Sequence, residues 1–99
     1  MLNKQEIKEL LKNKKYDKIV HIFRTEYTNM VFEFAKKNNI ELNENTEVEE
    51  LILIISQDFP ELEGYMMTLS NLLTSPDMNL GDHLNHMINN YDTIKEALT

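Results

Sequence analysis

Two histidines form the pair in this chain that looks most suited to chemistry. His83 and His86 are three residues apart, so on a helix they share one face, with Asp82 adjacent. Imidazole and carboxylate groups bind zinc, but a tetrahedral site needs at least three protein ligands at fitting distances. His21 is the only other histidine, and no second ligand cluster is visible. We therefore expect no metal site, and we interpret His83 and His86 as exposed residues at a helix N-terminus, where the helix dipole disfavours a charged imidazole.

Arg24 is the only arginine in the chain, and it also lies three residues from a histidine, His21. A guanidinium group binds carboxylate or phosphate oxygens through two parallel hydrogen bonds. The simpler interpretation, which we favour, is an ion pair with one of the many acids of this chain or a pairing along its own helix. The alternative is a catalytic pair of Arg24 with one of the three histidines, His21, His83 or His86.

The densest basic stretch spans residues 12–18 and holds four lysines, Lys12, Lys14, Lys15 and Lys18. Binding to nucleic acid depends on several lysine or arginine contacts with phosphates. Four lysines are a weak signal in a chain with 17 acidic and 10 basic residues, a formal net charge of −7. We interpret the stretch as a solvated turn between helices, and binding of nucleic acid through it is the weaker alternative.

Several catalytic and cofactor-binding motifs are missing from the sequence. The chain has no cysteine, which excludes disulfides, thiolate metal ligands and a cysteine nucleophile. Its two glycines, Gly64 and Gly81, cannot build a glycine-rich loop that cradles phosphates. No serine lies in a nucleophile elbow, and spacing alone pairs none of the carboxylates as an acid and a base. The sequence therefore predicts no cofactor and no catalytic residue.

Charge is divided unevenly along the 99 residues. Residues 1–37 hold nine bases and five acids, a net charge of +4, whereas residues 38–99 hold one base and twelve acids, a net charge of −11. We favour the interpretation that basic and acidic segments pack side by side and partly cancel. The alternative is that the acidic part repels nucleic acid while residues 12–18 contact it. A negative surface suits a basic protein partner.

The length of the chain suits one domain, over residues 1–99, with one modest core. Hydrophobic residues make up 41% and charged residues 27%, as in ordinary globular proteins. The longest apolar run, residues 51–55, is far shorter than the roughly 20 residues that span a bilayer. The first 15 residues lack the apolar segment of a signal peptide. We expect a soluble, cytoplasmic protein without membrane contact.

Apolar residues recur at helical spacing along almost the whole chain, and no stretch alternates as a strand does. Helices are predicted over residues 3–12, 16–37, 46–58, 60–73 and 82–98. The strongest stripe, with spacings of 4, 3, 4, 3 and 4, is Tyr16, Val20, Phe23, Tyr27, Met30 and Phe34. The pattern predicts an all-α fold, an up-and-down four-helix bundle with a short extra N-terminal helix.

The ends of these helices carry recognisable signals. Asn3 is expected to cap the first helix, and Asn38-Asn39 to end the second in the left-handed conformation. Thr46 and Asp82 are expected to cap the third and fifth helices. The third helix is apolar nearly all round, which predicts the most buried element. Gly64, inside the fourth helix, is expected to permit a close helix crossing.

The methionines divide into two groups. Met30, Met66 and Met87 fall on predicted core stripes, whereas Met67 and Met78 fall outside them. With neighbouring apolar residues, the second group predicts an exposed patch that makes a homodimer contact. The residues of this predicted patch are Phe59, Met67, Met78 and Leu80.

The order of elements resembles the HEPN-like helical domains of prokaryotes over roughly residues 5–98. The likeness rests on a short basic helix, a long helix that starts at Tyr16 and carries Arg24-Thr25-Glu26-Tyr27, a loop containing Ile40, and the helix opening at residues 46–52. It implies an up-and-down four-helix bundle that pairs about a two-fold axis and, in active members, a metal-independent ribonuclease.

The nuclease signature of that family is an arginine followed, after four to six residues, by a histidine near the start of the last long helix. Here Asn29, Met30 and Val31 follow Arg24 at that spacing, and residues 73–86 hold histidines but no arginine. The resemblance therefore implies a member without the nuclease pair. The sequence as a whole predicts a non-catalytic, acidic binding or dimerisation module acting on a protein partner, with a ribonuclease that uses a displaced active pair as the alternative.

Overall fold

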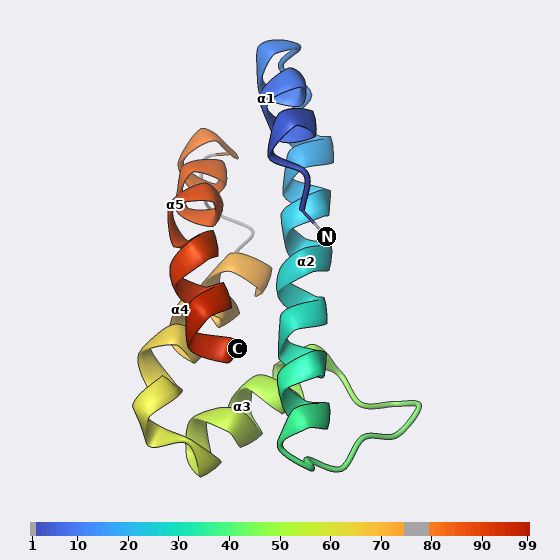
Figure 1. The fold of residues 1–99 in the computed structure, drawn as a ribbon, viewed down its shortest axis with the longest axis vertical. Helices are drawn as coiled ribbons and strands as arrows, with labels where there is room; N and C mark the ends of the chain where they lie inside the picture. The colour runs from blue at the N-terminus through green and yellow to red at the C-terminus, as the bar shows by residue number, and fades with distance from the viewer. Residues whose placement is uncertain (1, 75–79) are drawn as a thin grey trace.

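The computed structural model describes residues 2–74 and 80–99, and Figure 1 shows how they are arranged. Over these residues the structure has helices and no strand, so the predicted all-α class is confirmed. The molecule is elongated, with extents of 41 × 26 × 26 Å. Its elements are α1 (Lys4–Lys12), α2 (Tyr16–Lys37), α3 (Val48–Asp58), the 3₁₀ turn η1 (Pro60–Leu62), α4 (Glu63–Thr74) and α5 (Leu80–Leu98).

Two of the predicted helix ends are confirmed by their hydrogen bonds. The Asn3 Oδ1 atom accepts from the backbone N–H groups of Gln5 and Glu6 at 3.0 and 3.2 Å, so Asn3 caps α1. After α2, Asn39 has a φ of 59°, and the Ile40 N–H donates to the Ala35 carbonyl at 2.9 Å. The left-handed residue turns the chain sharply away and satisfies carbonyls that the helix end leaves open.

Three finer predictions about the helices are wrong. The Thr46 hydroxyl does not cap α3 but accepts from the Asn43 N–H at 2.8 Å, and α3 begins at Val48 with Glu47 before it. Asp82 does not cap α5, because α5 already begins at Leu80 and Asp82 lies in its first turn. A Cβ atom added at Gly64 would meet nothing within 4 Å, so no helix crosses closely there.

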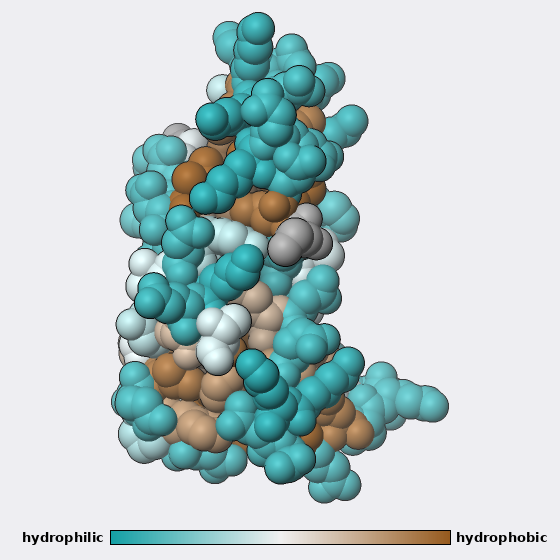
Figure 2. Space-filling model, in the orientation of Figure 1, coloured by the Kyte–Doolittle hydropathy of each residue, from teal (hydrophilic) through white to brown (hydrophobic). Residues whose placement is uncertain are grey.

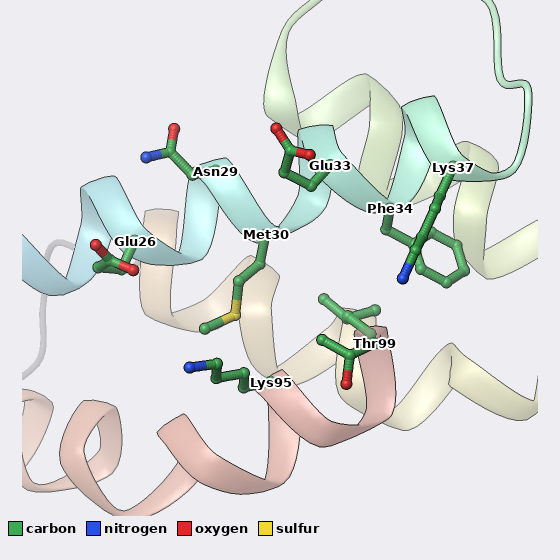
Figure 3. Close-up of a pocket in the computed structure, with 9 residues that line it drawn as sticks. Glu26, Asn29, Met30, Glu33, Phe34, Lys37, Lys95 and Thr99 are labelled. Atoms are coloured by element: carbon green, nitrogen blue, oxygen red, sulfur yellow. The ribbon is translucent and has the colours of Figure 1, made fainter. Parts of the chain in front are cut away.

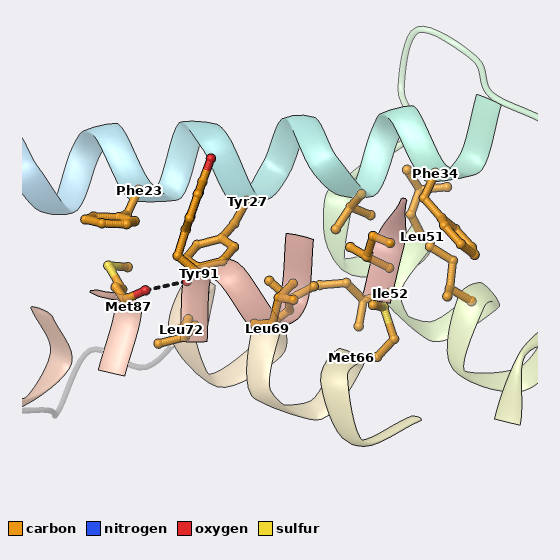
Figure 4. Close-up of a cluster of buried hydrophobic side chains, with 14 of the residues drawn as sticks. Phe23, Tyr27, Phe34, Leu51, Ile52, Met66, Leu69, Leu72, Met87 and Tyr91 are labelled. Atoms are coloured by element: carbon orange, nitrogen blue, oxygen red, sulfur yellow. Dashed lines mark hydrogen bonds between the residues drawn. The ribbon is translucent and has the colours of Figure 1, made fainter. Parts of the chain in front are cut away.

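The core lies between α2, α3, α4 and α5 (Figure 4). The rings of Phe23 and Tyr27 from α2 pack around the Tyr91 ring of α5, with centroids 5.7 and 5.9 Å from it. The Tyr27 hydroxyl donates to the Met87 carbonyl at 2.5 Å and so ties α2 to α5 inside the core. Other fully buried residues come from every one of these helices: Ile19, Val31, Leu51, Ile55, Met66, Leu69 and Met87.

Of the three methionines predicted to fill the core, Met66 and Met87 are fully buried and Met30 is half-buried. The prediction that the third helix is the most buried element is wrong. The inner face of α3 contributes Leu51, Ile52 and Ile55 to the core, but Leu53 on its outer side is 65% exposed.

The up-and-down order of four antiparallel neighbours is not confirmed. In Figure 1, α2 and α5 both run from the top of the view to the bottom, α3 crosses at the lower end, and α4 returns upward. Helix α3 has 11 residues against 22 in α2, and so is only about half as long at about 1.5 Å per residue. It therefore cannot carry the chain back along α2, and α4 makes the return instead. Within the described ranges, no helix has the length and hydropathy needed to cross a bilayer.

Candidate functional site

The exposed side of α2 carries a shallow hollow around Arg24. It has a volume of about 270 Å³ and is lined by His21, Arg24, Thr25, Thr28 and Asn29. These residues lie together because positions three, four and seven apart share one face of a helix. The Thr25 hydroxyl donates to the His21 carbonyl at 2.9 Å, while the Arg24 and His21 side chains are exposed to solvent. The structure thus brings together the predicted pair His21 and Arg24.

His83 is not an exposed residue at a helix start, as the sequence suggested, but a buried one that is 3% exposed. Burial lowers the pKa of His83, the positive charge of Arg24 and the proximity of His86 lower it further, and a backbone hydrogen bond with Leu72 opposes them. The earlier start of α5 explains the error, because His83 lies one turn before Met87 on the buried face of that helix. The spacing of four residues between His83 and Met87 was a signal for this.

Two of the three histidines that could pair with Arg24 therefore lie in its vicinity. Arg24 lies near enough for its charge to act on His83, and it shares a hollow with His21. His86 is exposed and also acts on His83. A guanidinium in such a place can hold an anion, and an imidazole can accept or donate a proton. Across the described part of the chain, no three His, Cys, Asp or Glu side chains are placed to hold a metal ion.

A second hollow lies between α2 and the last turn of α5 (Figure 3). Its volume is about 350 Å³. Met30 and Phe34 reach from α2 toward α5, and Lys95 reaches from α5 toward Met30. Carboxylates and amines share the rim, since Glu26, Glu33, Lys37 and Lys95 all line it. With both signs of charge at its mouth, this hollow favours no one class of charged ligand.

The lysines of residues 12–18 lie at one end of the molecule. Lys12 ends α1, Lys14 has a φ of 57° in the turn, and Lys15 immediately precedes α2. These lysines and Lys18 are exposed, in keeping with a solvated turn between two helices. We call residues 4–18 the basic end; they hold six lysines and three acids.

Residues 38–63 form the opposite end of the long axis, around the lower end of α2 in Figure 1, and we call them the acidic end. They hold eight acids and no base: Glu41, Glu44, Glu47, Glu49, Glu50, Asp58, Glu61 and Glu63. In the described part of the chain, the ion pairs are Lys4–Asp92 and Lys36–Glu33, both at 3.9 Å, and neither uses an acid of this end. The basic end and the acidic end therefore lie apart, although the larger segments to which they belong, residues 1–37 and 38–99, pack side by side as expected, with α2 against α3 and α5 and with Lys4 paired to Asp92.

The acidic end also carries an exposed apolar side chain. Leu53 is 65% exposed, and Glu49 lies one turn before it on the same face of α3. Sequence reasoning missed Leu53 because the run Leu51–Ile55 looked uniformly buried. The space-filling view in Figure 2 shows hydrophilic side chains over the lower end of this face, with apolar surface between them.

The predicted dimer patch is only partly visible. Met67 is 62% exposed on α4. Phe59 is half-buried, because its ring packs edge-on against Phe34 with centroids 5.2 Å apart. Met78 and the side chain of Leu80 lie outside the described residues. The structure therefore supports Met67 as an accessible residue and places Phe59 at the edge of the core.

Comparisons of the chain with protein families, with curated proteins and with solved structures found no match.

Proposed function

We propose that this protein is a non-catalytic helical binding module whose acidic end docks a basic protein partner. The observation that carries the proposal is the separation of charge along the 41 Å axis, with eight acids and no base over residues 38–63. The acids of this end form no ion pairs within the described chain. A partner with lysines and arginines is therefore attracted to this end and repelled from the other.

Leu53 gives such a partner an apolar anchor. Burying a leucine side chain contributes about 1.5–3 kcal/mol, whereas exposed charges at the rim of an interface mainly set approach and specificity. An exposed leucine with Glu49 on the same helical face therefore fits an interface in which apolar burial supplies affinity and charge selects the partner.

The test is affinity capture from cells that make this protein, with two matched variants. The first, E47Q/E49Q/L53S, removes two charges and the exposed leucine from the acidic end. The second, E6Q/E9Q/Y16S, removes two charges and an exposed aromatic ring from the basic end. We expect the first variant to lose the basic proteins that the unaltered chain retains, and the second to keep them. Equal retention by both variants would overturn the proposal.

We also propose that the chain forms a homodimer. We propose further that it is related to HEPN-like domains, which pair about a two-fold axis. Met67 is an accessible member of the expected contact, at 62% exposure. Size-exclusion chromatography with light scattering checks this at high micromolar concentration. We expect a dimer that M67E converts to a monomer; a wild-type chain that stays monomeric would remove dimerisation from the proposal.

A ribonuclease is the second candidate, favoured by the placement of Arg24, which shares a hollow with His21 and lies near the buried His83. An arginine that holds a phosphate beside a proton-transferring histidine is suited to cleaving RNA without a metal. The test incubates labelled RNA with the protein in the presence of a chelator. Cleavage that R24A and H83Q abolish, with folding intact by circular dichroism, would establish this function; no cleavage by the wild type would exclude it.

A further inference from the structure

The loop that follows α2 borders an open hollow against α3, which no pattern in the sequence predicted. Its volume is about 550 Å³, within the size range of ligand clefts, about 300–1,000 Å³. Three carboxylates and three apolar side chains stand out in its lining, and no lysine or arginine is among the residues that form it. They are Glu41, Glu50 and Asp58, with Ile40, Ile54 and Phe59.

The wall of the hollow is held by the bonds of its own loop. The Ile40 N–H donates to the Ala35 carbonyl at 2.9 Å, which fixes where the loop leaves α2. The Asn43 N–H donates to the Thr46 hydroxyl at 2.8 Å, and the Asn45 N–H donates to Asn43 Oδ1 at 2.8 Å. These loop groups therefore satisfy one another's hydrogen bonds. The carboxylates of Glu41, Glu50 and Asp58 take no part in these bonds and remain available to a ligand.

Two of the apolar side chains, Ile40 and Phe59, join the core to the hollow. Phe59 packs against Phe34 on one side and lines the hollow on the other, and Ile54 is half-buried on α3. Carboxylates beside an apolar floor match the lysine and arginine side chains, whose aliphatic stems lie on apolar surface while their charged ends meet acids. A small metal ion is a poorer match, because within the described residues no three ligands converge on one point.

We propose that this hollow binds a basic segment of the partner protein, in which lysine or arginine side chains flank an apolar residue. The inference rests on the proposed function, since it names the subsite within the acidic end. The charged ends of the partner's side chains pair with Glu41, Glu50 and Asp58. Its apolar residue covers Ile54 and Phe59. The charge of the hollow and its apolar floor thus set a requirement for a segment that is both basic and amphipathic.

The experiment uses a fluorescent twelve-residue peptide of arginine, leucine and serine as the probe, with anisotropy as the readout. The variant E41Q/E50Q/D58N removes three charges from the hollow, and the matched control E6Q/E9Q/D17N removes three from the basic end. We expect the first to weaken binding by about tenfold or more, and the control by less than about twofold. Equal weakening in both would show attraction to net charge alone and overturn the proposal.

A second set of variants tests the apolar floor. Ile54 lines the hollow, whereas Ile22 is a half-buried isoleucine of α2 outside it, and Leu53 is 65% exposed on the outer side of α3. We expect I54A to weaken binding of the peptide several-fold and the control I22A to leave it nearly unchanged, while L53A reports whether the outer face of α3 also contributes. Amide shifts of the labelled protein on titration are expected over residues 38–59. Circular dichroism establishes that each variant is folded.

The outcomes separate this inference from the proposed function. If L53A weakens binding while I54A and E41Q/E50Q/D58N do not, the partner uses the outer face of α3, and only the hollow is wrong. If none of the acidic-end variants changes binding, both proposals fail. Binding of spermidine, with no binding of the peptide, would replace the protein segment by a small polycation and overturn the proposal.

Discussion

The two ends of this molecule differ in how they are attached as well as in charge. At the basic end, α1 contributes one buried residue to the core, Ile7, with half-buried leucines around it. At the acidic end, α3 contributes three, Leu51, Ile52 and Ile55. The acidic end is thus a charged surface on a firmly packed helix, whereas the basic end is a short helix laid against α2. A rigid support favours a binding surface, because less conformational entropy is lost on association.

We expect the largest loss of stability from L51A, at the acidic end. Leu51 is fully buried, and removing its side chain leaves a cavity in the core. We expect the free energy of unfolding to fall by about 2–5 kcal/mol, measured by urea denaturation followed by circular dichroism. A loss below about 1 kcal/mol would mean that α3 is not anchored as described.

The corresponding change at the basic end is I7A. Ile7 is 7% exposed and is the buried residue of a nine-residue helix. We expect α1 to detach locally, with a global loss of about 2 kcal/mol or less. Hydrogen exchange checks this: amides of α1 are expected to lose protection while those of α3 keep it. Uniform loss across both helices would contradict the difference between the ends.

We expect a smaller loss of stability from Y27F, which removes the hydrogen bond between α2 and α5. The substitution removes the hydroxyl that donates to the Met87 carbonyl at 2.5 Å but keeps the ring. Burial, together with Tyr91 and Asp92, raises the pKa of Tyr27, so the phenol remains a donor at ordinary pH. We expect a loss of about 0.5–1.5 kcal/mol in thermal or urea unfolding. The control Y91F, whose hydroxyl is 3.5 Å from Glu26, should cost less.

The smallest effect concerns His83, between the two ends, and it depends on pH. Burial, Arg24 and His86 lower the pKa of His83 below its ordinary value of 6.5, so the unfolded chain takes up this proton first as pH falls. The free energy of unfolding is therefore highest above pH 6.5 and declines below it. H83Q should reduce the difference in stability between pH 7.5 and 5.5, and H86Q, which removes only one of the causes of the lowered pKa of His83, should reduce it less. A wild-type chain that gains stability on acidification would reverse the assigned sign.

The sequence was most informative where one pattern dominated over many residues. The stripe of α2 predicted its bounds, and the Asn38-Asn39 pair predicted its end, because local backbone chemistry decides both. Where two patterns compete, prediction failed. Thr46 can cap a helix or close a loop, and it closes the loop; the run Leu51–Ile55 has no polar member to show which residue faces outward.

The candidate sites were harder to predict, because they depend on how elements meet. The uneven charge was visible in the sequence, but its distribution to opposite ends follows from the short α3, which leaves the acidic loop and helix at the far end of α2. The burial of His83 required the start of α5, which lies two residues before the expected cap. The hollow at residues 38–59 arises from a loop folded back on α3, and no spacing in the sequence encodes that contact.

The most direct test of the central claim is photo-crosslinking at the two ends within cells that make this protein. A benzophenone side chain placed at residue 53 reports on the acidic end, and one placed at residue 8 reports on the basic end. We predict that residue 53 forms an adduct with a basic protein and that residue 8 forms none with it. Adducts to that protein from residue 8 alone, or equally from both positions, would contradict a partner site at the acidic end.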